Sequence, residues 1–202
     1  MIKRLKGIPP QFSRRHGETL GRMNESIPSI DELFSPLIGL PCWNVKHGHG
    51  SFLTFEFGNP GLTIHEPRDT PDTTPRVKES LTQRLVTVHG QWHLWVYCCG
   101  WRIQQHKKQY AHNESDDAKI TAACSALDGQ ALTQVITPRT SWTQFHFDLG
   151  GMLTTGPYDD KCNEHWMLYC PGGCVYTYRS DGRVSFGSKD QTPDDKQWIT
   201  TG

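Results

Sequence analysis

The sequence resembles itself at a shift of 90 residues, and this internal similarity constrains the fold more than any other feature of the chain. Leu37-Ile-Gly39 falls on Leu127-Asp-Gly129, and the similarity continues from there without a gap. The matched positions that follow are Val45 and Val135, Ser51 and Ser141, Phe55 and Phe145, Phe57 and Phe147, and Gly61 and Gly151. After a loop of different length, Gln91-Trp-His-Leu94 resembles His165-Trp-Met-Leu168. Agreement in order, spacing and residue type is the signature of a duplicated unit.

This similarity predicts two related modules, residues 29–104 and residues 113–188. Each module has the pattern of a short helix ending in Leu-x-Gly, a strand, a Phe-x-Phe strand, a glycine turn and a strand that contains tryptophan. The expected class is therefore α+β, with predominantly antiparallel β-sheet and few short helices. The two modules either pack around a pseudo-twofold axis or merge their strands into one larger sheet.

Hydrophobic periodicity supports the expected strands. In segment 51–57, apolar residues alternate with polar ones, which is typical of a half-buried strand. Segment 92–103 is apolar on both faces, which predicts a central strand buried on both sides. Gly90-Gln91 precedes it and predicts a tight hairpin with segment 84–89. Turn residues at 171–173 and 180–182 predict two further hairpins.

Two helices carry start and stop signals. Ser29 and Glu32 form a capping-box pattern, and Pro36 should limit that helix to about two turns. A second helix is expected over residues 116–127, with Asn113 and Ser115 as candidate caps. Gly129 lies just past its end, where a left-handed glycine commonly terminates a helix.

Three segments lie outside this pattern. Residues 1–28 carry six basic and two acidic side chains without apolar periodicity, which predicts a basic, flexible arm. Residues 66–76 contain three prolines and predict an exposed loop. Residues 189–202 form a polar tail, which Trp198 and Ile199 could hold against the body.

Charge balance and apolar runs exclude several functional classes. The 202 residues include 21 Lys and Arg and 21 Asp and Glu, so bulk charge attracts no polyanion and nucleic acid is not an expected partner. No apolar run approaches the ~18 residues of a spanning helix, which argues against a membrane. The first residues lack the apolar stretch of a secretory signal, and the seven cysteines are an odd number. We therefore expect a cytoplasmic protein with mostly reduced thiols.

Cys162, His165, Cys170 and Cys174 place four soft side chains within thirteen residues, which makes them the best candidate metal ligands. Zinc takes sulfur and nitrogen ligands in tetrahedral geometry. Strand parity, however, puts His165 and Cys170 on opposite faces, and the spacing matches no standard zinc pattern. The favoured alternative is that they are core or hairpin residues, with Cys170 and Cys174 facing each other across a turn. No metal and no cofactor are expected.

Histidines and a vicinal cysteine pair suggest other chemistry in the first module. The histidines are His47, His49, His65, His89 and His93. They could form a cluster, but glycines around the first two indicate a loop, and no carboxylate is spaced to orient the imidazoles. Cys98 and Cys99 near His93 suggest a thiol nucleophile. A strand crowded with tryptophan should raise the pKa of such a thiol rather than lower it, which argues against catalysis.

The succession of Leu-x-Gly, Phe-x-Phe, a turn glycine and a tryptophan strand ending at Pro171-Gly-Gly173 resembles small, β-rich bacterial proteins of uncharacterised families. Some proteins of this kind are immunity proteins, which neutralise a toxin made by the same or a neighbouring cell. The resemblance covers residues 29–188. It rests on turn glycines and core aromatics, so it implies a fold type and hints at a role but transfers no functional residue.

We therefore expect a non-enzymatic protein-binding module, of the kind of an immunity-type inhibitor of a toxin or effector protein. Trp101, Arg102 and Tyr110 are the candidate partner-binding residues, because this stretch changes abruptly from aromatic to polar and because Trp, Tyr and Arg dominate binding hot spots. Two alternatives stay open. One is a hydrolase that uses His89, His93 and Cys98 or a zinc ion, and the other is a structural protein that forms homo-oligomers.

Overall fold

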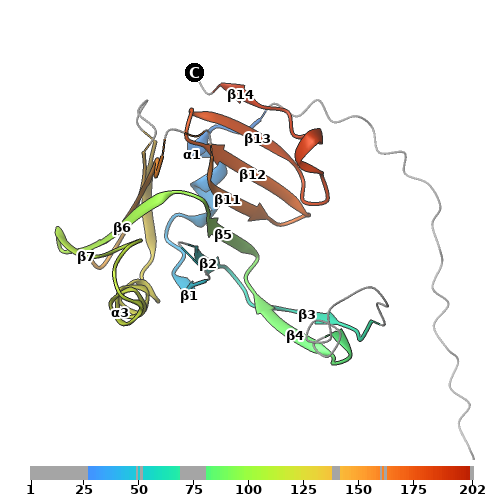
Figure 1. Cartoon of the computed structure of the whole chain (residues 1–202), viewed down its shortest axis with the longest axis horizontal. Coiled ribbons are helices and arrows are strands. Elements are labelled where there is room, and N and C mark those ends of the chain that lie inside the picture. Colours follow the sequence, from blue (N-terminus) through green and yellow to red (C-terminus); the bar gives the residue numbers. More distant parts are fainter. Residues whose placement is uncertain are drawn as a thin grey trace, which may run out of the picture.

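The computed structural model describes residues 27–48, 50, 52–68, 81–137, 142–159, 161 and 163–200. Antiparallel strands form two large sheets and one small one (Figure 1). The seven-stranded sheet runs, in spatial order, through β1 (Cys42–His47), β2 (Leu53–Phe57), β5 (Trp92–Val96), β11 (Glu164–Cys170), β12 (Cys174–Arg179), β13 (Arg183–Ser188) and β14 (Ile199–Thr200). The five-stranded sheet runs through β7 (Lys108–His112), β6 (Gly100–Gln105), β10 (Gly151–Gly156), β9 (Thr143–Phe147) and β8 (Leu132–Ile136). The small sheet is the hairpin of β3 (Gly61–His65) and β4 (Leu85–His89). The expected α+β class with predominantly antiparallel sheet is confirmed.

Short helices begin and end at the signals in the sequence. α1 (Ile30–Phe34) has the expected capping box, with Ser29 as its N-cap, and continues into the 3-10 turn η1 (Ser35–Leu37) at Pro36. α3 (Asp117–Leu127) is capped by Asp116 rather than by Asn113 or Ser115. Its chain then turns at Gly129, where φ is +88°. A second 3-10 turn, η2 (Pro193–Asp195), lies in the C-terminal segment.

Aromatic side chains fill the space between the two large sheets. Phe55 of β2 stacks on Phe147 of β9, with 6.4 Å between ring centroids. Phe145 of the five-stranded sheet meets Trp166 of the seven-stranded sheet edge to face at 5.9 Å. Phe34 of α1 contacts both of these rings. Alternation in β2 and β9 directs these side chains inward, so the half-buried strands predicted from periodicity form the core.

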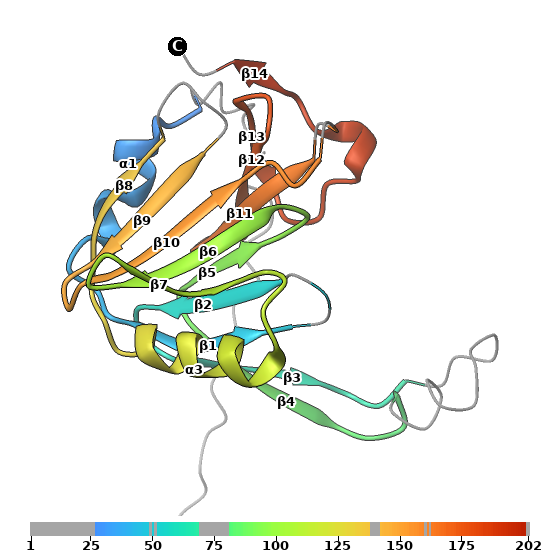
Figure 2. The ribbon, with the colours of Figure 1, turned by 60° about the vertical axis from the view of Figure 1, so that its left-hand side comes forward.

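Helices lie at the ends of this sandwich (Figure 2). α3 packs against β1 of one sheet and β7 of the other, and α1 packs beside β8. Helices that contact both sheets cover apolar side chains that the strands alone would leave at the rim. Within the described part of the chain, no helix is long and apolar enough to cross a membrane.

Reciprocal backbone hydrogen bonds join two segments that are 90 residues apart. Gly39 N–H donates to the Leu132 carbonyl at 2.7 Å, and Gly129 N–H donates to the Cys42 carbonyl at 2.8 Å. An antiparallel bridge between Pro41 and Ala131 lies at the centre of this crossing. The hairpins on either side share one register, because Cys42 pairs with Phe57 as Leu132 pairs with Phe147. A local twofold axis therefore passes between Pro41 and Ala131.

The chain then exchanges strands between the sheets. β5 lies beside β2 in the seven-stranded sheet, whereas β6, which follows it, lies in the five-stranded sheet. β10 and β11 make the opposite crossing. The halves 29–104 and 113–188 therefore contribute strands to both large sheets and are not separate bodies. Leu94 and Leu168, matched in the sequence alignment, are instead direct neighbours on the adjacent strands β5 and β11.

Two expectations for segment 84–103 are wrong. The first expectation was a hairpin around Gly90, but β4 pairs with β3 instead of with β5. The second was one long central strand, but the chain leaves the seven-stranded sheet after Val96. Cys98, with φ of +36°, lies at this corner. Segment 92–103 is rich in apolar residues because it supplies core side chains twice. β5 supplies them from the seven-stranded sheet and β6 from the five-stranded sheet.

The C-terminal segment returns to the body. β14 pairs with β13, with Ile199 opposite Val184. The Arg179 guanidinium lies 4.6 Å from the centroid of the Trp198 ring. These contacts hold residues 196–200 against the seven-stranded sheet, as the sequence suggested for Trp198 and Ile199.

Replacement of Phe145 by alanine tests the position of the core. The ring is fully buried between the sheets, so F145A should lower the free energy of unfolding by about 3–5 kcal/mol in urea denaturation. L149A in the exposed turn between β9 and β10 is the control, and it should change stability by less than about 0.5 kcal/mol. Equal effects of the two substitutions would contradict the position of the core.

Candidate functional site

The three residues expected to contact a partner have different environments. Trp101 is only 2% exposed, because β6 directs it into the core, so it is not available to a partner and that prediction is wrong. Arg102 points outward, with its guanidinium 5.4 Å from the centroid of the Trp142 ring. Tyr110 on β7 is exposed as well. Arg102 and Tyr110 thus remain accessible to a partner, but the buried Trp101 cannot contact it with them.

The candidate zinc ligands do not form a site in the part of the chain that the structure describes. Cys162 lies outside the described residues. His165 is fully buried, burial lowers its pKa to about 4, and no described residue bonds to either ring nitrogen. Cys170 and Cys174 pair directly across the β11–β12 ladder, as expected for hairpin cysteines. No group of three or more described His, Cys, Asp or Glu side chains is arranged to hold a metal ion.

The thiols give little support to a cysteine nucleophile. Burial raises the pKa of Cys42 and of Cys170 to about 12, that of Cys124 to about 11, and that of Cys99 further still. Cys98 lines a small cavity of about 350 Å³ with Asn113 and Tyr158, whereas His93 lines a different one. The structure therefore does not bring together the Cys98 and His93 of the hydrolase alternative.

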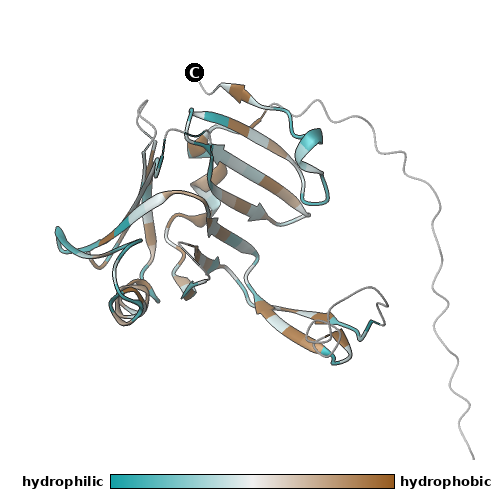
Figure 3. Ribbon diagram, viewed as in Figure 1, coloured by the Kyte–Doolittle hydropathy of each residue, from teal (hydrophilic) through white to brown (hydrophobic). Residues whose placement is uncertain are grey.

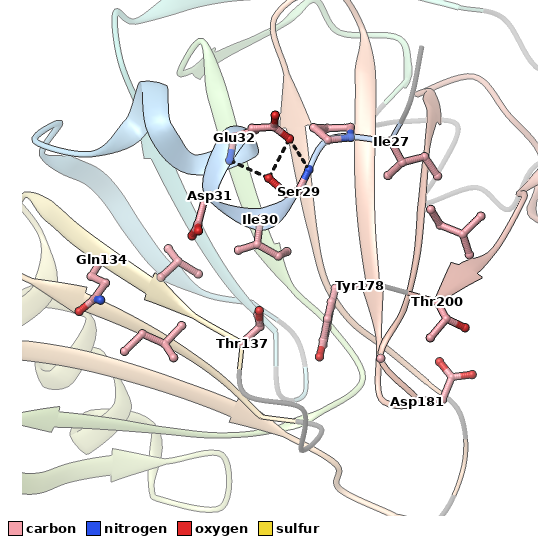
Figure 4. A pocket seen from close by; sticks show the side chains of 15 residues that line it. Ile27, Ser29, Ile30, Asp31, Glu32, Gln134, Thr137, Tyr178, Asp181 and Thr200 are labelled. Atoms are coloured by element: carbon pink, nitrogen blue, oxygen red, sulfur yellow. Dashed lines mark hydrogen bonds between the residues drawn. The ribbon is translucent and has the colours of Figure 1, made fainter. Parts of the chain in front are cut away.

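A cavity of about 910 Å³ opens beside the N-terminus of α1 (Figure 4). Its described wall contains three carboxylates, Asp31, Glu32 and Asp181, and no Lys, Arg or His. Glu32 is engaged by Ser29 in the capping box, and Asp181 pairs with Arg179 at 3.0 Å. Most polar groups here already serve the fold, so the cavity does not present the convergent free groups of an active site.

A second cavity, of about 720 Å³, lies where the β3–β4 hairpin leaves the seven-stranded sheet. The buried carboxylate of Glu56 is at its floor and accepts two hydrogen bonds of 2.8 Å, from Gly90 N–H and from His93 Nδ1. Tyr169 lies beside His93, with 5.6 Å between ring centroids. His65 and His89 also line this cavity, so three of the histidines suspected of clustering do meet here.

Glu56 orients His93 through its ionised form. Burial by itself would raise the pKa of Glu56, but the hydrogen bonds from His93 and Gly90, with the nearby charges of His93 and His89, outweigh burial and lower it below its usual value. An ionised carboxylate only accepts hydrogen bonds, so Nδ1 of His93 carries a proton. The expectation that no carboxylate orients these imidazoles is therefore wrong, because strand pairing supplies Glu56 from 37 residues away.

Above this cavity, the β3–β4 hairpin projects from the two large sheets, and both of its strands contain hydrophobic residues (Figure 3). Leu62 pairs with Val88 and Ile64 pairs with Val86, so the four side chains share one face. They are 66%, 50%, 56% and 50% exposed, respectively. Thr63, Thr87 and the neighbouring histidines lie on the other face and border the cavity. The polar face of this ribbon is therefore turned to its own cavity and the apolar face to solvent.

Comparison of the chain with protein-family models, with curated proteins and with solved structures finds no match. The function therefore rests on the geometry of this chain.

The sequence analysis did not identify the exposed apolar face of the β3–β4 hairpin, although the sequence of both strands alternates between apolar and polar residues. Leu62-Thr-Ile64 and Val86-Thr-Val88 both alternate, which is the pattern of strands with one apolar face. The pattern does not say whether such a face is buried. Segment 84–89 was expected to form a tight hairpin with segment 92–103, whereas in the structure it pairs with β3.

The Glu56 carboxylate makes stability dependent on pH in a defined window. Its pKa is lowered on folding, so its contribution is present above the unfolded pKa of about 4.5 and is lost as the pH falls through the lower folded value. E56Q should therefore cost about 1–3 kcal/mol at neutral pH, because Gly90 and His93 lose an ionic acceptor. The cost should shrink below about pH 4.5. Urea denaturation of both proteins at several pH values measures it, and a cost independent of pH would contradict the ionised pair.

Proposed function

We propose that this chain is a protein-binding protein whose contact element is the apolar face of the β3–β4 hairpin. The observation that carries the proposal is the exposure of Leu62, Ile64, Val86 and Val88 on one face of a ribbon that pairs with no third described strand. A two-stranded ribbon has little stability of its own in water. Contiguous exposed apolar residues mark interaction sites on soluble proteins.

The proposed occupant is a different protein with an apolar cleft that receives the hairpin. The four side chains expose roughly 400 Å² together, about half of what each partner buries in a stable interface. Two copies stacked face to face would cover this area and leave the outer strand edges open. Two copies paired edge to edge would leave both apolar faces in water. A cleft with aliphatic walls would cover the apolar face of the hairpin and also border its strand edges. This favours a partner protein of a different shape over a second copy of the chain.

A projecting hairpin is suited to an inhibitor that inserts into a cleft of its target. The hairpin projects from a rigid sandwich, so it can enter a cleft without rearrangement of the body (Figure 1). In an immunity-type inhibitor, the cleft would belong to a toxin or effector protein. The exposed Arg102 and Tyr110 lie on the five-stranded sheet, away from the hairpin, and so play no part in this proposed contact.

We also propose that the two halves arose from a duplicated unit. The common register around Pro41 and Ala131 supports this origin, as does the matching order of strands in the two large sheets. The two halves then differ at the hairpin, because β10 pairs directly with β9, whereas β3, which aligns with β10, pairs with β4 instead of β2. An element present in one half of a repeated fold is a reasonable carrier of specific function.

The double substitution I64S/V86T tests the proposed contact. A photo-crosslinking residue at position 62 identifies the partner in the source cells, and the purified partner is then titrated by calorimetry. The substitutions remove apolar contact at the centre of the face, so affinity should fall at least about tenfold. The thermal midpoint should change little, because both side chains are exposed.

L149S is the matched control, because Leu149 is equally apolar and exposed but lies in the β9–β10 turn. It should bind the partner like the unchanged protein. Equal binding of I64S/V86T and L149S would overturn the proposal. So would a concentration-dependent homodimer in sedimentation analysis that I64S/V86T abolishes, because the occupant would then be a second copy.

A further inference from the structure

We propose that the cavity beneath the hairpin binds an oxyanion, a carboxylate or a phosphate group, through Lys189 and the Nε2 atoms of His89 and His93. The site lies on the opposite face of the hairpin from the apolar residues. It would give a partner of the proposed cleft type a second, polar point of recognition. The inference does not depend on that partner, because a free anion tests it.

Several hydrogen-bond acceptors of the cavity wall are already used. Both carboxylate oxygens of Glu56 receive donors, from His93 and from Gly90. The side-chain oxygen of Gln91 accepts from Asn59 N–H at 3.1 Å, and the Gly90 carbonyl accepts from His89 Nδ1 at 3.0 Å. A ligand that enters this cavity therefore finds few free acceptors for its own donors.

Donors remain free in the same wall. Lys189 forms no ion pair among the described residues, and its aliphatic stem lies against Gly173 in the β11–β12 turn. No described residue accepts from the hydroxyl of Tyr169 or the side-chain amide nitrogen of Gln91. A wall with an unpaired ammonium group, whose carboxylate oxygens already receive donors, favours a ligand that only accepts, and oxyanions are such ligands.

The two histidines have a fixed tautomer that suits this role. Glu56 and the Gly90 carbonyl can only accept, so Nδ1 of His93 and Nδ1 of His89 each carry a proton. Each Nε2 atom is then the ring nitrogen left to contact a ligand. When protonated, it becomes a charged donor, and a bound oxyanion favours that state.

The charged and titratable groups of the cavity bear on the sign of the ligand. Lys189 and Glu56 cancel, and protonation of His65, His89 and His93 adds up to three positive charges. Tyr169 and Cys170 have raised pKa values and stay neutral, while the Cys174 thiol is the other titratable group in the wall. A protonated imidazole beside Lys189 therefore adds to the attraction for an anion. The ammonium group and the absence of a described metal-ligand cluster argue against a cation here.

Histidine NMR signals test the site in the protein alone. Inorganic phosphate is titrated at about pH 6 and constant ionic strength, with the imidazole Cε1–H signals as readout. The signals of His89 and His93 should shift and saturate, while those of His47, His106 and His112 outside the cavity should not. K189Q should weaken phosphate binding roughly tenfold, since it removes a charge-assisted contact. K108Q on β7 is the matched control and should leave it unchanged.

The same titration is repeated with acetate and with a glutamate-containing peptide in place of phosphate. Saturation by acetate or by the peptide alone would assign the site to carboxylates of a protein, and saturation by phosphate alone would assign it to a phosphate group. Shifts of all histidines together without saturation, or equal phosphate affinity of K189Q and K108Q, would overturn the site. Neither outcome bears on I64S/V86T, so the two proposals fail separately.

Discussion

The backbone crossing at Pro41 and Ala131 is the constraint on which the rest of the structure depends. β1 is one edge of the seven-stranded sheet and β8 is one edge of the five-stranded sheet, and the segments that precede them exchange hydrogen bonds there. The crossing joins the sheets at their edges and fixes where the inner faces meet. Phe55 and Phe147 then stack across the gap, and apolar burial between the sheets provides the main driving force for folding.

The order of strands in the sheets also explains why the β3–β4 hairpin projects from the seven-stranded sheet. In the five-stranded sheet, β10 follows β9 directly and pairs with it. In the seven-stranded sheet, β5 takes the corresponding place beside β2, so the chain between them must leave the sheet and return. Gly90 lies at the return, where a Cβ atom would come within 2.5 Å of the Phe57 carbonyl oxygen. Glu56 anchors this point by accepting from Gly90, which ties the base of the hairpin to the sheet.

The two main cavities differ in a way that bears on function. In the cavity beside α1, Glu32 caps a helix and Asp181 pairs with arginines, so two of its three carboxylates serve stability. The cavity beneath the hairpin has one compensated carboxylate, three histidines and an unpaired lysine among its described residues, so its polar groups are available. This cavity borders the same hairpin that carries the exposed apolar face. Both proposals therefore concern this end of the molecule.

Local signals in the sequence were sufficient for the elements that depend on neighbours in the chain. The capping box at Ser29, the stop at Gly129 and the alternation in β2 and β9 all predict what forms, because capping and side-chain alternation act over a few residues. The 90-residue similarity agrees with the register shared by the β1–β2 and β8–β9 pairs. The class of the fold followed from these features.

Only the tertiary structure decided which strands pair and which faces are covered. Segment 92–103 has one continuous apolar pattern, yet it divides between two sheets, and Trp101 becomes a core residue instead of a surface one. Leu62 and Val88 have the pattern of buried residues, yet they lie in solvent. Glu56 meets His93 only because β2 and β5 are neighbours. The sequence determined which residues form strands, helices and turns, whereas pairing and burial depend on distant segments that compete for the same sheet edges, and that competition is settled only when the whole chain has packed.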